Sequence, residues 1–173
     1  MNIRILKILG ITIIVILLSF SCRKSDIIIE DSTSITDDGS GTGTVTWTKD
    51  KEYLLDGFVF VNPGQTLTIE AGTVIRAKTG QGESASALIV ARGGKITANG
   101  TYGNPIVFTS ILDDGSLPTD TSGLWGGIII LGSAPINTDT GEGFIEGIPV
   151  SEARGQFGGS NEADNSGSLE FKF

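Results

Sequence analysis

Three acidic residues lie close together in one polar segment of the chain: Asp113, Asp114 and Asp120. Paired carboxylates can act as general acid and base, or they can hold Ca²⁺ while a basic residue takes up the proton. The arginines that could serve as that basic residue are Arg76, Arg92 and Arg154. Aspartates are also favoured in turns with glycine and proline, and the segment "DDGSLP" is of this kind. The spacing therefore favours turn chemistry over catalysis.

Other reaction classes need residue types that this sequence lacks. It has no histidine and one cysteine, Cys22, which argues against Ser-His-Asp triads and the usual zinc sites. The segment "NEADNSGSLE", residues 161–170, is rich in oxygen-bearing side chains, but Ser166 stands where an EF-hand loop requires glycine. We therefore expect no cofactor and a solvated loop here, with a Ca²⁺-stabilised turn as the alternative.

Two tryptophans are candidates for surface roles. Trp125 stands between glycines in "GLWGG", where an exposed indole could stack on a sugar ring. The alternative is that Trp125 caps the core beneath a loop, and Trp47 is expected to cover the N-terminal end of the fold in that way. The candidate ligand contacts are therefore Trp125, Asp113, Asp114 and Asp120.

The chain starts like an exported protein. Arg4 and Lys7 precede an apolar run at residues 8–20. As a helix this run would be ~20 Å long, short of the roughly 30 Å hydrocarbon core, which favours a signal peptide over a membrane span. Cys22 follows "LLSFS" in a pattern that resembles the lipobox of bacterial lipoproteins, although Ser19 stands where that motif usually has leucine. We expect lipidation of Cys22, with a stray cysteine after an ordinary cleavage site as the alternative.

The rest of the chain divides by composition. Residues 1–21 are the expected signal peptide, residues 22–43 a polar, flexible tether rich in Ser, Thr, Asp and Gly, and residues 44–173 the folded domain. Loss of Arg4 and Lys7 with the signal would leave 10 of the 12 Lys and Arg against 20 Asp and Glu, a net charge of −10. Such a charge disfavours a nucleic-acid partner.

The folded domain reads as all-β. Short apolar-alternating runs predict strands, and no stretch shows a helical period. The runs lie at residues 45–48, 58–61, 67–69, 74–77, 88–91, 95–98 and 106–109. Gly, Asn and Pro between them predict turns. Residues 111–123 predict an acidic loop that projects from the strands.

Two lines of the sequence are nearly the same. "LTIEAGTVIRA" from Leu67 and "LIVARGGKITA" from Leu88 align at a spacing of 21 residues, and "IIILGSAPINT" from Ile128 fits a third repeat. Stacked coils explain such a period better than a β-sandwich, because equivalent apolar residues recur once per coil. We therefore predict a right-handed parallel β-helix of about three coils. Ile69, Val90 and Ile130 should be neighbours inside it, with Thr68 and Glu70 pointing outward.

The segment "TVTWTKDKEYLLDGFVFVNPGQTLTIEAGTVIRA", with "GLWGGIIILGSAPINT" and "EGIPVSEARGQFGG", resembles β-helical, pectin-lyase-like lipoproteins of the Bacteroidetes. The resemblance covers nearly everything from Thr44 onward. It implies an outer-membrane location in the bacterial cell envelope, usually with no assigned activity. Since family members are longer and this chain stops within "SLEFKF", we expect a truncated stack, with a natural last strand as the alternative.

These observations predict an exported, lipid-anchored envelope protein with a non-catalytic binding or display role. Its expected partners are the membrane, through the lipid anchor, and a glycan or another envelope protein. The alternative is a polysaccharide lyase or glycoside hydrolase of the β-helix type. Three or more carboxylates with a basic residue on one outward face would favour that alternative.

Overall fold

The structure is a computed structural model that describes residues 32–118 and 120–170. Its strands are short because turn-forming residues interrupt the apolar runs. They are β1 (Ser32–Ile35), β2 (Val45–Trp47), β3 (Glu52–Leu55), β4 (Phe58–Val61), β5 (Thr66–Ile69), β6 (Val74–Ala77), β7 (Ala87–Val90), β8 (Lys95–Asn99), β9 (Val107–Ser110), β10 (Ile128–Ile130), β11 (Glu142–Phe144), β12 (Gln156–Gly158) and β13 (Gly167–Glu170). The described helices are single 3-10 turns, η1 (Gly82–Ser84) and η2 (Ala153–Gly155). No helix in these ranges is long and apolar enough to cross a membrane.

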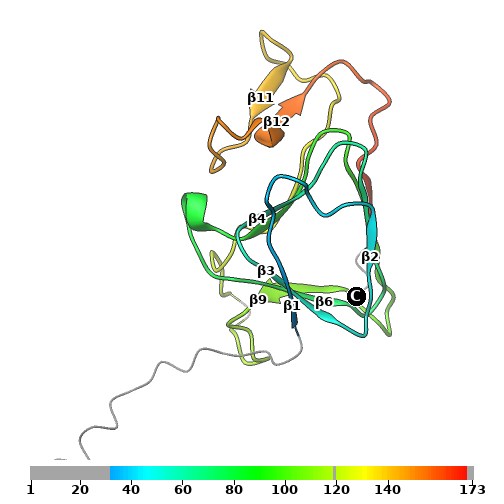
Figure 1. The fold of residues 1–173 in the computed structure, drawn as a ribbon, viewed down its shortest axis with the longest axis vertical. Helices are drawn as coiled ribbons and strands as arrows, with labels where there is room; N and C mark the ends of the chain where they lie inside the picture. The colour runs from blue at the N-terminus through cyan, green and yellow to red at the C-terminus, as the bar shows by residue number, and fades with distance from the viewer. Residues whose placement is uncertain (1–31, 119, 171–173) are drawn as a thin grey trace, which may run out of the picture.

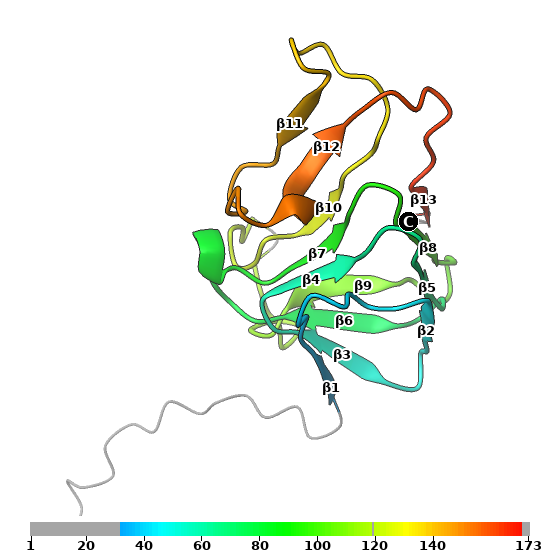
Figure 2. The same cartoon turned by 45° about the horizontal axis from the view of Figure 1, so that its top comes forward.

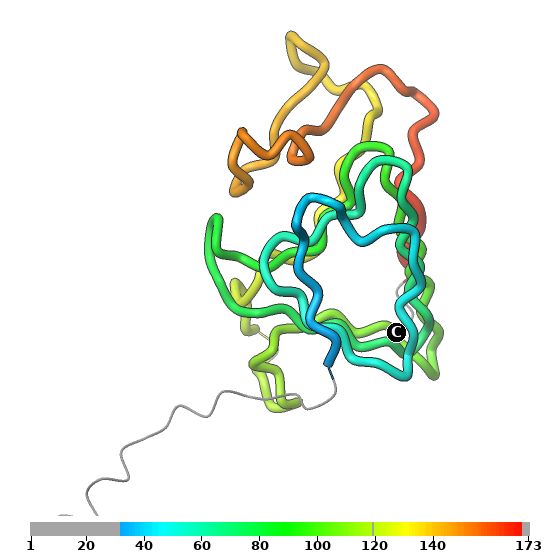
Figure 3. Tube along the Cα trace, in the orientation of Figure 1, coloured from blue at the N-terminus to red at the C-terminus, as the bar shows by residue number. Residues whose placement is uncertain are grey.

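The chain winds through three parallel sheets, and the tube in Figure 3 shows the resulting three-sided coil. The first sheet has the order β1-β3-β6-β9, the second β4-β7-β10, and the third β2-β5-β8-β13. Each strand pairs in parallel with the strand one coil away, about 4.8 Å distant along the stack. Figure 1 looks nearly along the stack. The predicted all-β fold, a right-handed parallel β-helix, is confirmed.

Alternation along each strand sends every second side chain into the coil. In β5, Leu67 and Ile69 are buried while Thr68 points outward, as the sequence predicted. The turn after it passes through Gly72 at φ +90°, and Ile75 of β6 returns to the core. The buried side chains inside the coil are Trp47, Tyr53, Leu55, Val59, Val61, Leu67, Ile69, Ile75, Ala77, Leu88, Val90, Ile96 and Ala98. They form the main core.

The predicted 21-residue register is wrong for its first interval. Leu67 and Leu88 lie in different sheets: Leu67 pairs with Ile96, and Leu88 pairs with Val59. Each of the two similar segments consists of two strands joined by a four-residue turn with a glycine at positive φ. The two segments form different corners of the coil. Ile69 is therefore not a neighbour of Val90, whereas the predicted pairs Leu88–Ile128 and Val90–Ile130 are confirmed.

The true coil length varies along the stack. Val45 pairs with Leu67 at 22 residues, and Leu67 pairs with Ile96 at 29. The longer coil contains η1 and the loop around it, which the turn signals did not distinguish from a corner. Residues 111–118 and 120–127 belong to the connection between β9 and β10, where a loop was predicted over residues 111–123.

A second core lies outside the coil, against the outward face of the second sheet. Residues 132–166, here called the insertion, leave the stack between β10 and β13 and contain the antiparallel hairpin β11-β12. Figure 1 and Figure 2 show this hairpin outside the coil, on the side of the sheet that contains β4 and β10. Apolar residues of both parts meet there: Phe60, Ala87, Ile89, Ala91, Leu131 and Ile148, with Phe58, Ile129, Ile145 and Phe157 partly buried around them.

The described part of the expected tether belongs to the stack. β1 pairs with β3, and the main-chain nitrogen of Thr42 donates to the oxygen of Phe60 at 2.8 Å. The carboxylate of Asp37 accepts a hydrogen bond from the nitrogen of Phe60 at 3.0 Å, which fastens this segment to β4. The folded part therefore begins before the expected boundary at Thr44. Residues 1–31, with Cys22 and the predicted signal peptide, lie outside the described residues, as do residues 171–173 of the predicted last strand.

Candidate functional site

One predicted arginine meets one predicted aspartate on the outward side of the first sheet. Arg76 of β6 donates through Nε to the carboxylate of Glu52 in β3, and through Nη1 to the main-chain oxygen of Asp113. Thr109 of β9 stands opposite Arg76 in the register, and its hydroxyl donates to Asp113 Oδ2 at 2.6 Å. The sequence alignment did not place these residues together, because it assigned β6 and β9 to no common row.

Lys78 and Asp56 extend this polar group by one further ion pair, with 2.7 Å between Nζ and Oδ2. Three carboxylates thus share this face with two basic side chains, the arrangement that would favour an enzyme. Each carboxylate, however, already has an internal partner: Glu52 pairs with Arg76, Asp56 with Lys78, and Asp113 with Thr109. The ion pairs neutralise Glu52 and Asp56, and hydrogen bonds from Thr109 and Gly115 occupy both carboxylate oxygens of Asp113.

The acidic pair itself makes the hydrogen bonds of a turn. Hydrogen bonds from the Thr109 hydroxyl and then from the nitrogen of Gly115 lower the pKa of Asp113 below its ordinary value. The hydroxyl and nitrogen of Ser116 lower the pKa of Asp114 in the same way. A general acid working near neutral pH needs the opposite shift. Asp120, in the same loop, is exposed.

Arg92, in the turn after β7, and Arg154, in η2 of the insertion, fasten the insertion to the rest of the chain on another side of the coil. Arg92 Nη1 lies 2.6 Å from Oε1 of Glu142 and 2.8 Å from the oxygen of Gly158. Neither arginine forms an ion pair with Asp113, Asp114 or Asp120 within residues 32–118 and 120–170.

Arg154 is the more enclosed of the two arginines. Its Nη1 lies 2.7 Å from Oδ2 of Asp37, whose side chain is only 1% exposed, and its Nη2 lies 2.6 Å from Oε2 of Glu152. The guanidinium carbon stands 3.9 Å from the ring centroid of Phe60. The hydrogen bonds with Arg154 lower the pKa of Glu152, and those with Glu152 and Asp37 raise the pKa of Arg154. The cluster therefore joins the insertion to the N-terminal segment.

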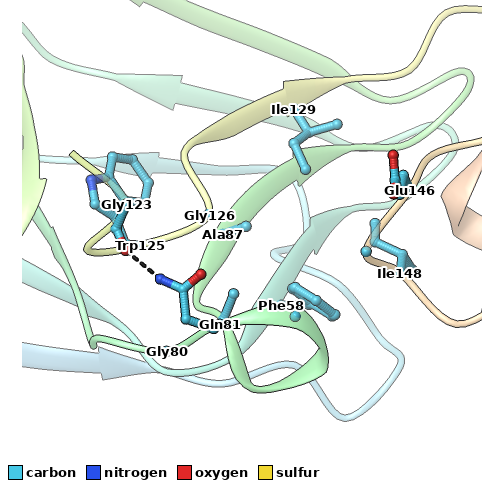
Figure 4. A pocket seen from close by; sticks show the side chains of 13 residues that line it. Phe58, Gly80, Gln81, Ala87, Gly123, Trp125, Gly126, Ile129, Glu146 and Ile148 are labelled. Atoms are coloured by element: carbon cyan, nitrogen blue, oxygen red, sulfur yellow. Dashed lines mark hydrogen bonds between the residues drawn. The ribbon is translucent and has the colours of Figure 1, made fainter.

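Trp125 is half-buried and packs against the main core, yet it also lines a groove. The groove has a volume of about 200 Å³ and lies between the η1 loop, the entrance to β10 and residues 146–148 of the insertion. Figure 4 shows Trp125 at one end of the groove and Glu146 at the other, with Ala87 and Ile129 between them. Of the four predicted ligand contacts, only Trp125 lines this groove.

Glycine and apolar side chains make the groove's walls smooth. The nitrogen of Gly126 donates to the oxygen of Ser86 at 2.8 Å, and a Cβ atom on Gly126 would stand 2.9 Å from the Cβ of Ala87. Only glycine therefore allows the loop to approach β7 this closely. The amide of Gln81 donates to the main-chain oxygen of Gly123, which ties the η1 loop to the Trp125 loop.

Most of the residues that line the groove were not predicted from the sequence. Phe58, Ile129 and Ile148 line it, together with Gln81 and Glu146. A signal was present for the strands, since "FVFV" at 58–61 and "ALIV" at 87–90 are apolar on both faces, a pattern that indicates cover on the outward side. The part of the insertion that supplies this cover, residues 145–148, has no such pattern.

The loop considered for Ca²⁺ uses its side chains internally. Asp164 Oδ1 accepts from the hydroxyl of Ser133 at 2.7 Å and Oδ2 from its nitrogen at 3.0 Å, and these bonds lower the pKa of Asp164. Within the described ranges, no three Asp, Glu, His or Cys side chains are grouped as metal ligands would be.

Trp47, in the edge strand β2, stacks on Tyr53 with 4.8 Å between ring centroids.

A comparison with protein families matches residues 39–172 to the model of a pectate-lyase-like beta helix domain. Neither the curated proteins nor the solved structures gave a match. The matched range includes the three sheets from β2 onward, the groove and the insertion.

Proposed function

Because the chain belongs to the family of pectate-lyase-like beta helix domains, we propose that it is an exported, lipid-anchored protein of the bacterial cell envelope that binds glycans without cleaving them. The anchor is Cys22, which follows the apolar run of residues 8–20 and precedes a polar stretch. The resemblance of "LLSFSC" to a lipobox and of residues 44–173 to Bacteroidetes outer-membrane lipoproteins supports this location.

The state of the ionisable groups supports a role in binding. Cleavage of a polysaccharide requires carboxylates, or a base beside a metal ion, that are free to act on the substrate. Glu52, Asp56 and Asp113 are held by internal partners, and the pKa of Asp113 is lowered rather than raised. The arginines are likewise engaged in ion pairs.

The groove beside Trp125 is the observation that carries the proposal. It combines an indole, apolar side chains and two polar groups at its rim, which is the composition that sugar rings require. Its volume, about 200 Å³, is below the ~300–1,000 Å³ of pockets for drug-sized ligands, so it accommodates about one ring of a longer chain.

Calorimetric titration of the full chain in detergent with soluble neutral, acidic and aminated oligosaccharides tests the proposal. We expect saturable binding that Trp125→Ala weakens by about tenfold, because the stacking surface is lost. Trp125→Phe keeps an aromatic ring against the core and should retain part of the affinity. Leu112→Ala, a change at an exposed side chain of the same loop, should leave binding unchanged. Absence of binding, or equal binding by Trp125→Ala, would show the proposal to be wrong.

A further inference from the structure

The groove contains negative charge and no positive charge. Among the residues that line it, Glu146 is the only charged side chain, and no lysine or arginine takes part. Glu146 is exposed and forms no ion pair with the described residues, whereas the carboxylates of Glu52, Asp56, Glu142 and Glu152 are all paired. A free carboxylate therefore stands at one end of an otherwise apolar groove.

The surroundings strengthen this negative field. Arg154, which packs on Phe60 in the second core beside the groove, is neutralised by both Asp37 and Glu152. Glu83 adds another acidic group in η1, the helix that follows Gln81. The chain as a whole carries 20 acidic against 12 basic residues. A negatively charged ligand would thus approach against the field of the protein and find no cation in the groove.

From this charge pattern we infer that the groove selects an amine-bearing sugar over a uronic acid, with Glu146 as the residue that determines the preference. The inference rests on the proposed glycan binding and names its ligand class. The sugar ring lies on the apolar floor toward Trp125, and its ammonium group faces the carboxylate of Glu146, which Figure 4 shows at the other end of the groove from Trp125. Gln81, on the wall between them, has a side-chain oxygen that can accept a hydrogen bond from a hydroxyl group.

Three oligosaccharides of equal length distinguish the effect of ligand charge on affinity from the effect of ligand shape. They are a glucosamine tetramer, its N-acetylated counterpart and a galacturonic acid tetramer. Titrations of the full chain in detergent at low salt should give the tightest binding for the glucosamine tetramer and the weakest for the galacturonic acid tetramer. The preference for the amine over the acetylated form should be about fivefold, the upper end for an exposed ion pair, and should shrink as salt is added.

Glu146→Gln should remove the preference for the amine while the acetylated tetramer binds as before. Glu162→Gln makes the same change of charge in an exposed part of the insertion outside the groove, and should leave the preference intact. Tightest binding of the galacturonic acid tetramer, or a preference for the amine that survives Glu146→Gln, would overturn the inference while glycan binding itself stands. Failure of all three tetramers to bind would contradict both the inference and the proposed function.

Discussion

Successive residues of one strand point alternately into the buried interior of the coil and toward its outer surface. Val90 is fully buried inside the coil, next to Ile130 of the following coil and Val61 of the preceding one. Thr68 points outward from β5, between Thr46 and Thr97. The effect of a substitution therefore depends on which face of the sheet the residue occupies.

Val90→Asp should destabilise the protein by several kcal/mol, because the carboxylate would be buried without a partner. Thr68→Asp is the matched control: the same new side chain points into solvent and should change the free energy of unfolding by about 1 kcal/mol or less. Denaturant titrations of both variants measure the difference. Equal losses would contradict the assigned faces.

Two glycines permit a similar comparison. A Cβ on Gly94 would stand 2.4 Å from the main-chain oxygen of Val61, so Gly94→Ala forces the corner between β7 and β8 away from the coil before it. Gly103 has no atom within 4 Å of the corresponding position. We expect a loss of about 1–3 kcal/mol for Gly94→Ala and no more than about 0.5 kcal/mol for Gly103→Ala in thermal unfolding. A tolerated Gly94→Ala would show that the coils are less closely stacked than described.

At the scale of elements, the insertion is the part that a β-helix does not require. Its hairpin covers the second sheet and is held by Arg92 and Arg154, which reach Glu142 and Asp37 from different parts of the chain. The contacts that fix it join residues far apart in sequence, so each contact constrains a large part of the fold.

Arg154→Ala should destabilise the protein by about 3 kcal/mol, since Asp37 is left buried without its cation. Lys78→Ala removes a pair of the same length, 2.7 Å, between exposed side chains, and should cost about 1 kcal/mol or less. Urea unfolding of both variants gives the comparison. If Lys78→Ala lowered the free energy of unfolding as much as Arg154→Ala, burial of the ion pair would not be what determines the cost of breaking it.

The insertion should also loosen in acid. Folding lowers the pKa of Glu152, through Arg154, and of Asp164, through Ser133. A carboxyl group with a lowered pKa stabilises the fold fully above its unfolded pKa, about 3.9 for Asp and 4.3 for Glu, and loses this contribution as the pH falls through the folded value. Hydrogen exchange should therefore show amides of residues 145–158 opening below about pH 4 before those of β5 and β7. Simultaneous opening of both regions would argue against a separate acid-sensitive insertion.

The sequence predicts those features of the elements that neighbouring residues determine, and it does not predict those that depend on contacts between distant residues. The alternation in β5 and β6 and the glycine turn between them follow from neighbouring residues, and they were predicted to within one residue. The register between the segments that begin at Leu67 and Leu88 was predicted wrongly, because β5-β6 and β7-β8 share one local pattern at different corners, whereas the register of Leu88 with Ile128 was predicted correctly. The hairpin was not predicted either, since "EGF" and "QFG" are too short to show alternation, and its position depends on Arg92 and Arg154 across the fold. For the same reason the groove escaped prediction, apart from Trp125.

At the scale of the whole molecule, the proposal joins a membrane anchor to a rigid stack of coils. Cys22→Ser should move the protein from the membrane fraction to the soluble fraction and abolish labelling by fatty acid, because the thiol is the proposed attachment point. Ser25→Ala, a nearby change that spares the cysteine, should leave the protein membrane-bound. A Cys22→Ser variant that still carries fatty acid would show that the proposed anchor is wrong.

The central claim is that this β-helix binds a glycan and does not cleave it. Any oligosaccharide that binds in the titrations should be incubated with the full chain, with and without Ca²⁺, and assayed for new reducing ends and unsaturated products. We expect saturable, Trp125-dependent binding with neither product formed. Turnover that is lost in Asp113→Asn or Glu52→Gln would contradict it, because the polar face around Arg76 would then be a catalytic site.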